Sequence, residues 1–477
     1  MKKTKIWFYI CISLFLTILL TPNNFYKYGN EESNNKSVET NKSTIIKTSM
    51  ILPKEIWNVS WTGPTLEAYS SDIDLDSKNN IYTTGDFGII GSNFTINKTD
   101  NVGKPLWSII IDSGYADGGN GIACDDLNNV YITGVVNVSS PSGSDVFIVK
   151  YNESGDQEWN KTWGGSEDDY GRDITIDSEG NVYVVGYTRS YSVKNESLLI
   201  LKYNNTGDFK WNQTWDTMYS EVGDTIDYDI LSNHLYIAGT QTIGTFPNYA
   251  SNAVILKYNT SLDREWVNYL DFALNESGKG IKVDLSGNIT ITGEIENTPQ
   301  DLEDVFLAKY NSSGNQLWNL TWNVWTDDFR GNDIDIDTEN NIYVVGIIDT
   351  FGSDVWLGIH STNGTKLYNM TWGTISNEEG GNGIVLDSSN YIYITGESYF
   401  AMNFANQFIL KLSPFNISAI YKPEPPILPG NNDNDDDDND DYDVSYLAIP
   451  GYNPLIIIFL LSVISSVAIK KKIRKSN

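Results

Sequence analysis

A short segment ending in glycine recurs seven times along the chain, and it constrains the fold more than any other feature. The glycines are Gly85, Gly134, Gly186, Gly239, Gly293, Gly346 and Gly396. The intervals between them are 49, 52, 53, 54, 53 and 50 residues. A period of about 50 residues is typical of propellers and other arrays in which each repeat packs on its neighbours. A rule of residues per domain therefore overcounts the domains of this 477-residue chain.

Each repeat contains four short segments that we predict to be strands. The first is acidic, as in DITID (173–177), and the second carries Tyr and the recurring Gly, as in NVYVVG (181–186). The third is clearest in DVFIVKY (145–151) and the fourth in WNKTW (159–163). All are rich in β-branched and aromatic residues and are bounded by Gly, Asn, Asp and Ser, which is typical of strands joined by turns.

The two ends of the repeat array complement each other. The chain enters on a strand of the fourth type, WNVSW (57–61), and leaves on one of the third type, QFILKL (407–412). If the ring closes, these strands complete one blade together. We therefore predict an all-β fold over residues 55–415, a seven-bladed β-propeller of four-stranded antiparallel blades closed by strands from both ends.

The stretch DVFIVKYNESGDQEWNKTWGGSEDDYGRDITIDSEGNVYVVGYT (145–188) resembles the SBBP repeat family of bacterial and archaeal seven-bladed β-propellers. The resemblance covers about residues 55–415 and implies the same fold. That family has no single assigned activity and appears in exported and surface proteins. The resemblance therefore implies an exported protein without naming its function.

The N-terminal segment predicts export. Lys2, Lys3 and Lys5 precede an apolar run at residues 6–20, so residues 1–22 are expected to be a signal peptide, with a retained signal anchor as the alternative. Residues 23–54 are expected to be flexible.

The C-terminal segments predict a membrane anchor. Residues 416–446 are rich in Pro and Asp, which is typical of an extended stalk. Residues 452–469 are apolar and long enough for a transmembrane helix, and the basic tail 470–477 is expected to be cytoplasmic. The tail also resembles archaeal surface anchors of the Pro-Gly-Phe type, with Tyr452 in place of Phe, so a retained helix is the preferred reading. We therefore expect a single-pass protein of the cell membrane whose propeller is extracellular.

The charge of the chain limits its partners. Outside the two basic terminal segments, 62 acidic residues stand against 24 basic ones. Such a surface argues against nucleic acid and anionic membrane as partners and leaves cations and basic partners.

The acidic first strand reads as structural. One position is Ile in all seven repeats, as at Ile174, and period-two alternation places it on a buried face. The strand-ending Asp, as at Asp177, is expected to hold a turn by accepting backbone N–H groups. A calcium loop is the alternative, but the twelfth residue counted from Asp333 is Val344 rather than Glu. Cys124 occupies a buried hydrophobic position, and the recurrent aromatic residues are expected to pack between blades.

A second set of acids precedes each first strand and gives a candidate metal site. If these loops lie on one face of a ring, their carboxylates form a crown that would hold Ca2+ or a cationic ligand. The alternative is that each acid serves its own loop. The crown would consist of Glu67, Asp117, Asp168 with Asp169, Glu221, Glu276, Asp328, and Glu378 with Glu379.

Asn-x-Ser/Thr sequons recur at two blade positions. In an exported protein they predict glycans on the rim and on one face of the ring. The alternative is that an Asn-rich chain contains such sequons by chance. The candidates in the third-to-fourth turn are Asn152, Asn204, Asn259, Asn311 and Asn363. Those in the fourth strand are Asn58, Asn160, Asn212, Asn319 and Asn369.

Catalytic motifs are scarce. The only histidines, His234 and His360, share no motif, and no P-loop or dinucleotide fingerprint occurs. No catalytic residue and no cofactor beyond Ca2+ is predicted. We expect a membrane-anchored surface module that binds a protein, a glycan or an envelope component. An extracellular hydrolase or quinone-dependent oxidoreductase and a structural spacer are the alternatives.

Overall fold

The computed structural model describes residues 46–421, apart from 62–67, 89–92, 115–116, 138–142, 194, 246–247, 271–274, 297–302, 323–327, 350–351, 375–376 and 401–403. The predicted signal peptide, the transmembrane helix and the basic tail lie outside the described residues. Within these residues the chain forms strands joined by turns and loops.

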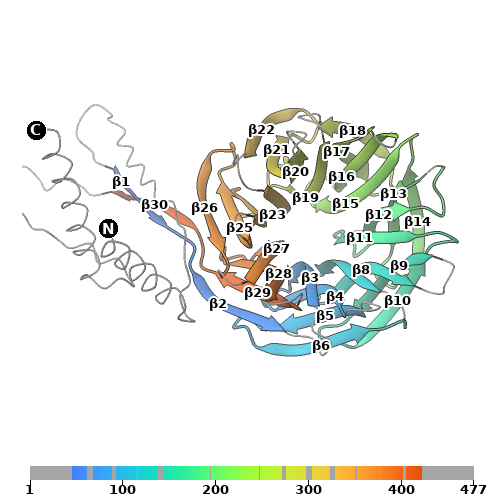
Figure 1. Ribbon diagram of the computed structural model, residues 1–477, viewed down its shortest axis with the longest axis horizontal. Helices are drawn as coiled ribbons and strands as arrows, with labels where there is room; N and C mark the ends of the chain where they lie inside the picture. Colours follow the sequence, from blue (N-terminus) through green and yellow to red (C-terminus); the bar gives the residue numbers. More distant parts are fainter. Residues whose placement is uncertain are drawn as a thin grey trace, which may run out of the picture. The chain divides into compact units, whose positions relative to one another are not determined.

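Seven four-stranded antiparallel blades are arranged radially in a ring (Figure 1). Two of them, β15 to β18 and β19 to β22, are joined into one eight-stranded sheet by a single parallel pair, Ser251 with Asn275. We number the blades 1 to 7 from β3, and the innermost strand of each surrounds the centre. The innermost strands are β3 (Ala68–Leu75), β7 (Gly118–Cys124), β11 (Asp169–Ile176), β15 (Ser220–Asp229), β19 (Asn275–Val283), β23 (Asp328–Ile336) and β27 (Asn377–Leu386).

The other three strands follow outward in chain order in blades 1 to 6, whereas blade 7 takes its outer strand, β2, from the start of the array. The second strands are β4 (Ile81–Phe87), β8 (Val130–Asn137), β12 (Val182–Thr188), β16 (His234–Thr245), β20 (Ile289–Glu296), β24 (Ile342–Asp349) and β28 (Ile392–Phe400). The third are β5 (Asn93–Thr99), β9 (Ser144–Tyr151), β13 (Ser197–Tyr203), β17 (Asn248–Asn259), β21 (Glu303–Tyr310), β25 (Ser353–His360) and β29 (Phe404–Leu412). The outer strands are β6 (Pro105–Ile111), β10 (Gln157–Trp163), β14 (Phe209–Trp215), β18 (Arg264–Leu270), β22 (Gln316–Trp322), β26 (Lys366–Trp372) and β2 (Glu55–Trp61).

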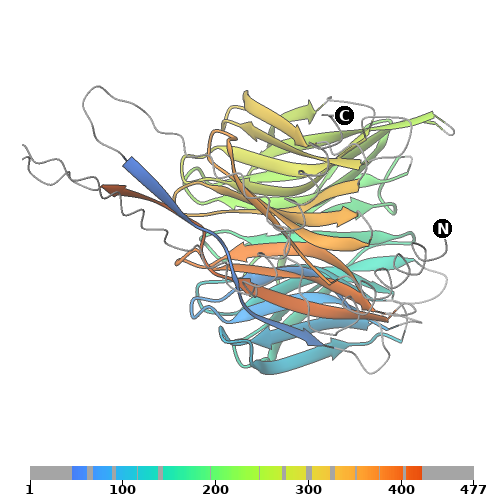
Figure 2. The same cartoon turned by 60° about the vertical axis from the view of Figure 1, so that its left-hand side comes forward.

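Strands from the two ends of the array complete blade 7, as the sequence predicts. β2 pairs antiparallel with β29 and becomes the outer strand of the sheet formed with β28 and β27. The ends then continue together, because β1 (Ile46–Ile51) pairs antiparallel with β30 (Asn416–Tyr421). Figure 2 shows this ribbon leaving the blades. Ordered pairing therefore extends beyond residues 55–415 into the segments expected to be flexible linker and stalk.

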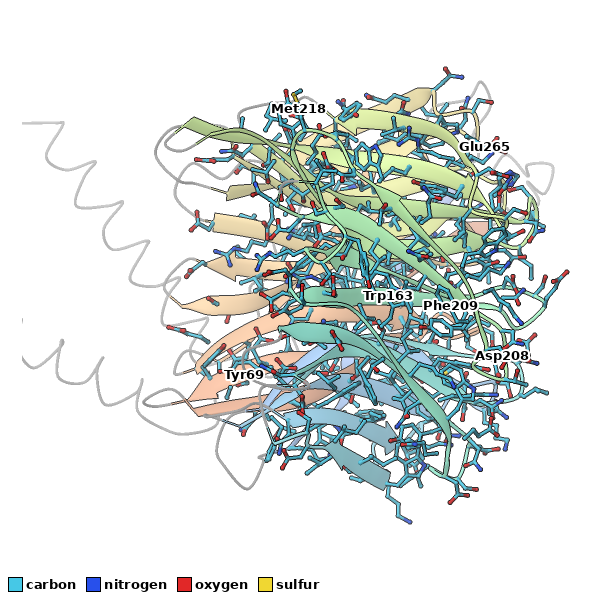
Figure 3. All side chains as sticks on the ribbon, turned by 90° about the vertical axis from the view of Figure 1, so that its right-hand side faces the viewer. Tyr69, Trp163, Asp208, Phe209, Met218 and Glu265 are labelled. Atoms are coloured by element: carbon cyan, nitrogen blue, oxygen red, sulfur yellow. The ribbon has the colours of Figure 1, made fainter. Side chains whose placement is uncertain are left out.

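The ring has two faces, which we name by their connections. The turn face carries the short turns between the first and second strands and between the third and fourth strands. The loop face carries the connections between blades. Figure 3 shows Asp208 and Glu265 at the turn-face end of the blades and Tyr69 at the loop-face end.

The hydrophobic core consists of clusters that lie between adjacent blades. One cluster joins Tyr82 and Phe94 of blade 1 to Ile122 and Phe147 of blade 2, and the other junctions have equivalent clusters. The predicted buried isoleucine is 3% to 5% exposed in every blade. Burying one such side chain contributes about 1.5–3 kcal/mol. The period-two prediction for the first strand is thus confirmed.

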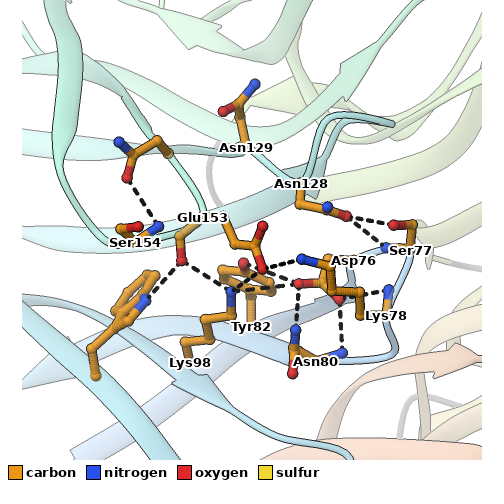
Figure 4. A network of polar contacts seen from close by, with 12 residues as sticks. Asp76, Ser77, Lys78, Asn80, Tyr82, Lys98, Asn128, Asn129, Glu153 and Ser154 are labelled. Carbon is orange, nitrogen blue, oxygen red and sulfur yellow. Dashed lines mark hydrogen bonds and ion pairs between the residues drawn. The ribbon is translucent and has the colours of Figure 1, made fainter.

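The turn Asp is held as predicted, and it belongs to a larger network between blades (Figure 4). Asp76 accepts the backbone N–H groups of Lys78 and Asn80 and the hydroxyl of Tyr82. The ammonium of Lys98 lies 4.8 Å from the Tyr82 ring centroid and donates to the Glu153 carbonyl of the next blade. These bonds give the buried carboxylate the hydrogen-bond partners that a buried polar group requires.

A tryptophan of the outer strand completes the same junction. Trp107 and Trp159 donate their indole N–H to the carbonyls of Glu153 and Asn205, at 3.3 and 3.1 Å. Each indole also packs under a glycine of the turn that it contacts, Gly155 for Trp107. The predicted inter-blade packing of the aromatic residues is therefore confirmed. The lysine that shares the carbonyl was missed, because a Lys within an apolar strand reads as an exposed residue.

Candidate functional site at the inner bulges

The acids expected to form a crown on the loop face separate into buried and exposed groups. Asp117, Glu221 and Glu276 are buried, whereas Asp168 and Asp328 are half-buried. In blades 3 and 7 the buried carboxylates are those of the neighbouring residues, Asp169 and Glu379, and Glu378 is exposed. Glu67 lies outside the described residues.

Four of the buried acids bind the loop that precedes their own strand. Asp117 accepts the backbone N–H of Ser113 at 2.6 Å, and Glu221 accepts that of Thr217 at 3.2 Å. Asp169 does the same for Gly165, and Glu379 for Thr374. Within residues 46–421, gaps excepted, no three Asp, Glu, His or Cys side chains are grouped to hold a metal ion. Four of the buried carboxylates are therefore engaged by their own loops, and the calcium crown stays a prediction.

A different feature of the inner strands recurs in all seven blades. Each innermost strand has a β-bulge that leaves one residue unpaired with the second strand. The bulge moves a backbone carbonyl toward the second strand, so a Cβ on Gly186 would lie 1.9 Å from the carbonyl oxygen of Tyr170. The same clash would arise at the other six glycines that define the repeat. The glycine period is thus the sequence signature of a ring of bulges.

The unpaired bulge residue holds neighbouring blades together in three places. The side-chain amide of Asn120 donates to the carbonyl of Gly171 in blade 3, at 2.7 Å. Asn332 donates in the same way to Gly381, and Asn382 to Ser70 across the closing junction. An Asn at this position acts as a clasp on the next blade.

The clasp is lost over three consecutive blades. Blades 3, 4 and 5 carry Arg172, Asp224 and Lys279 at the bulge, and blade 1 carries Ser71. Arg172 is exposed, and Asp224 and Lys279 are half-buried. We name these three residues the bulge arc. Bulges often re-aim side chains next to functional sites, and here three charges replace a structural amide.

Aromatic rings support the arc at blade 3. Tyr170 and Tyr187 stack with centroids 5.0 Å apart and planes at 13°. The guanidinium groups of Arg172 and Arg189 lie 5.7 and 5.8 Å from the Tyr187 centroid. Arg189 is paired with Asp168 at 2.9 Å and with Glu196 at 2.7 Å. Asp168, expected as a metal ligand, thus neutralises an arginine.

Aspartates at the ring centre link the inner strands below the bulges. Asp173 accepts the backbone N–H of Ile226 in blade 4, and Asp72 and Asp333 make the same bond to Ile122 and Ile384. One register step further, Asp74, Asp227 and Asp335 bind the N–H groups of Cys124, Val283 and Leu386. The alternation of Asp in the first strand therefore joins blades, a role that strand periodicity alone does not indicate.

Lys282 of blade 5 occupies the same register position as Asp74, Asp227 and Asp335. Its ammonium lies 3.8 Å from Asp227 and 3.7 Å from Asp335. Although protein surrounds it, the side chain is 39% exposed, so water reaches the centre. The negative charges of Asp227 and Asp335 raise the pKa of Lys282, and Lys282 partly neutralises the acids around it.

The carboxylates at the centre are difficult to ionise. Burial raises the pKa of Asp173 to about 6 and that of Asp333 to about 7. The pKa of Asp72 is also well above its usual range, first because of burial and then because of the charges of Asp173 and Asp333. Burial disfavours the charged form of an acid, and nearby like charges add to the effect.

The two histidines and Cys124 lie in three different blades. Burial lowers the pKa of His360 to about 4, and its ring lies 4.6 Å from that of Trp322. His234 contacts Ser232 and Glu265 on the turn face. Cys124 is half-buried against the core between blades 1 and 2, and burial raises the pKa of its thiol.

The sequon asparagines differ between their two positions. Those of the outer strands, Asn58, Asn160, Asn212 and Asn319, are exposed, and Asn369 is half-buried. In the turns, Asn152, Asn204, Asn259 and Asn311 accept backbone N–H groups of their own turn through the side-chain oxygen. Asn363 does so for Thr365. The turn asparagines thus have a structural role, and glycosylation at both positions stays a prediction.

Comparison with known proteins agrees with the fold. The family model described as a beta-propeller repeat (SBBP) matches residues 162–192, from the end of β10 into the loop after β12. An uncharacterized WD repeat-containing protein of Acanthamoeba polyphaga mimivirus is 27% identical over 262 residues. That match covers 46% of this chain and 18% of the viral protein, so the chain spans less than a fifth of that relative.

Solved propellers are similar in structure at low sequence identity. The WD40 domain of Neurospora crassa Pan2 has a TM-score of 0.50 and 8% identity, covering 75% of this chain and 95% of that chain. A Staphylococcus aureus virginiamycin B lyase variant has a TM-score of 0.46 and 12% identity, covering 76% and 99%. The similarity to Pan2 shows the propeller fold alone.

No helix among the described residues has the length and apolar character needed to cross a membrane. The predicted transmembrane helix at 452–469 falls outside them, as does the predicted signal peptide. Export, anchoring and the archaeal type of tail stay predictions.

Proposed function

We propose that the protein is an extracellular, membrane-anchored binding module whose recognition site is the bulge arc on the loop face. The ligand is a protein, a glycan or another envelope component, in keeping with the predicted export and the acidic surface. Membrane attachment would place the ring outside the cell, and the paired ribbon β1–β30 would carry it.

One observation carries this proposal: three consecutive blades carry charged residues at the bulge position, where blades 2, 6 and 7 carry Asn and blade 1 carries Ser71. Asn120, Asn332 and Asn382 make a favourable clasp at their bulges. Blades 3, 4 and 5 forgo that bond and instead carry Arg172, Asp224 and Lys279. A residue that serves only the fold would follow the repeat, whereas a binding residue needs to differ from its equivalents.

The test restores the repeat. A triple variant, Arg172→Asn, Asp224→Asn and Lys279→Asn, gives the arc the clasp residue of blades 2, 6 and 7. The full chain would be screened in detergent against glycans and isolated envelope proteins. We expect the variant to bind the wild-type ligand with at least about tenfold lower affinity, because it lacks the charged contacts. Its melting temperature should be unchanged or higher, because new clasps form.

The opposite pattern would refute the proposal. Unchanged binding would show that the arc does not recognise the ligand. A lower melting temperature with unchanged binding would assign the three charged residues to stability instead.

A glycan hydrolase is the second candidate, favoured by the raised pKa values of Asp173 and Asp333. Groups with such shifts are common in active sites. However, Asp173 accepts N–H groups of Ile174 and Ile226, and Asp333 accepts those of Ile334 and Ile384, so both oxygens of each are engaged. Turnover of a glycan panel that disappears in Asp333→Asn, with the fold retained, would favour hydrolysis over binding.

A further inference from the structure

We infer that the loop face of blade 3 binds a saccharide that carries a carboxylate, with Arg172 contacting the carboxylate and Tyr191 the sugar ring. This inference rests on the proposed function and names the ligand class of the same site. It follows from the state of Arg172, the rings around it and the carboxylate next to it.

Arg172 is an uncommitted cation in an acidic protein. Within the described part of the chain it makes no hydrogen bond or ion pair, and it is exposed. Arg189, which contacts the same tyrosine, is neutralised by Asp168 and Glu196. With 62 acidic residues in the chain, an arginine left without an acid is positioned for an anion from outside.

The neighbouring carboxylate does not occupy Arg172. Asp173 is next in sequence, but its oxygens accept the N–H groups of Ile174 at 2.7 Å and Ile226 at 2.8 Å. The hydroxyl of Thr225 is a third donor, at 3.0 Å. Because these bonds direct Asp173 toward blade 4, the guanidinium keeps its N–H edge available.

The tyrosine stack prepares Arg172 for binding. The guanidinium lies near the ring of Tyr187, which is itself stacked on Tyr170. Contact with a ring face holds the planar group and leaves the donors along its edge for a bidentate carboxylate. Less side-chain freedom is then lost when the ligand binds.

An exposed aromatic ring on the same blade favours a saccharide over an acidic peptide. Tyr191, in the loop after β12, is 55% exposed, and its ring lies 5.1 Å from that of Trp163. Its hydroxyl donates to the carbonyl of Gly164, and Ser190 beside it is held by Asp169. A rigid, exposed ring gives a flat apolar surface with low entropic cost, which suits the C–H face of a pyranose.

The experiment uses matched ligands with the full chain in detergent. The probes are a xylo-oligosaccharide with one glucuronate and the same oligosaccharide without it, measured by calorimetry. We expect the charged probe to bind about tenfold or more tightly, the size of one charge-assisted contact. Arg172→Gln should abolish the difference, and Arg172→Lys should retain part of it. Tyr191→Ala should weaken both probes.

Lys210→Gln, on the outer strand β14, is the charge-matched control and should bind like the wild type. Equal affinity for the two probes, or an unchanged preference in Arg172→Gln, would overturn the inference. A glutamate-rich peptide that competes as well as the charged sugar would overturn the saccharide class. A ligand other than the acidic saccharide that binds Arg172→Gln but not the triple Asn variant would overturn this inference and leave the proposed function intact.

Discussion

Replacing Lys309 with methionine should destabilise the protein more than the same change at any other equivalent lysine. Blade 5 has Thr290 where the other six blades have a tyrosine in the second strand. In blade 5 the ammonium of Lys309 contacts Asp284 directly at 2.7 Å, and both side chains are 1% exposed. Lys309→Met leaves a buried carboxylate without its counter-ion. Removing one partner of a buried pair costs about 3–5 kcal/mol.

Lys98→Met in blade 1 is the matched control. Its ammonium lies 3.5 Å from Asp76, which keeps the hydroxyl of Tyr82 and the turn N–H groups after the change. We expect a smaller loss there, about 1.5–3 kcal/mol, the size of one hydrogen bond to a charged group. Urea denaturation of the full chain, followed by tryptophan fluorescence, measures both. A loss in Lys309→Met no larger than that in Lys98→Met would refute the reasoning.

The pH dependence gives a second check on the same pair. Asp284 has a pKa below its usual value; burial raises it, but hydrogen bonds from Lys309 and Asn288 outweigh that effect. A depressed carboxyl pKa contributes stability above the unfolded value, which is lost as the pH falls through the folded value. The difference in unfolding free energy between wild type and Lys309→Met should therefore shrink below about pH 4. Thr290→Tyr added to Lys309→Met should recover part of the loss, because tyrosine donates to this carboxylate in blades such as blade 3.

Three further outcomes follow. Trp159→Ala should lower the free energy of unfolding by about 3 kcal/mol, and Trp211→Ala by less than about 1 kcal/mol. The turn that faces Trp211 has Leu262, at φ 64°, in place of the usual glycine, and Trp211 is 52% exposed. Equal losses in urea denaturation would contradict this prediction. The melting temperature should fall as the pH rises from about 4 to about 7, because the raised pKa values of Asp173 and Asp333 make their ionisation unfavourable in the folded state. In calorimetric scans, a melting temperature that is higher at pH 8 than at pH 5 would contradict this prediction. The melting temperature should be the same with calcium and with a chelator, because the carboxylates of Asp117 and its equivalents accept backbone N–H groups of their loops. A higher melting temperature with calcium would support a calcium site in these loops.

The sequence by itself determined the blades. The recurring glycine, the strand Ile and the turn Asp meet local requirements of every blade, so each occurs seven times in the sequence. The complementary ends predicted that β2 would complete the sheet of β29, as it does. Recurrence alone did not distinguish two roles of the acid before every first strand, because a crown and a residue that serves each loop separately recur in the same way.

Only the tertiary structure decided where the symmetry is broken. A bulge depends on how a strand meets its neighbours, and period-two alternation does not reveal it. The bonds of Asp72, Asp173 and Asp333 reach the next blade about 50 residues later in the chain, a distance over which sequence patterns carry no pairing information. Likewise, Arg172 and Arg189 are the same residue type, and one is free while the other is neutralised because of the acids that folding brings beside them. The repeat in the sequence specifies how each blade packs. Whether a charged side chain has a partner depends on the residues that folding brings beside it.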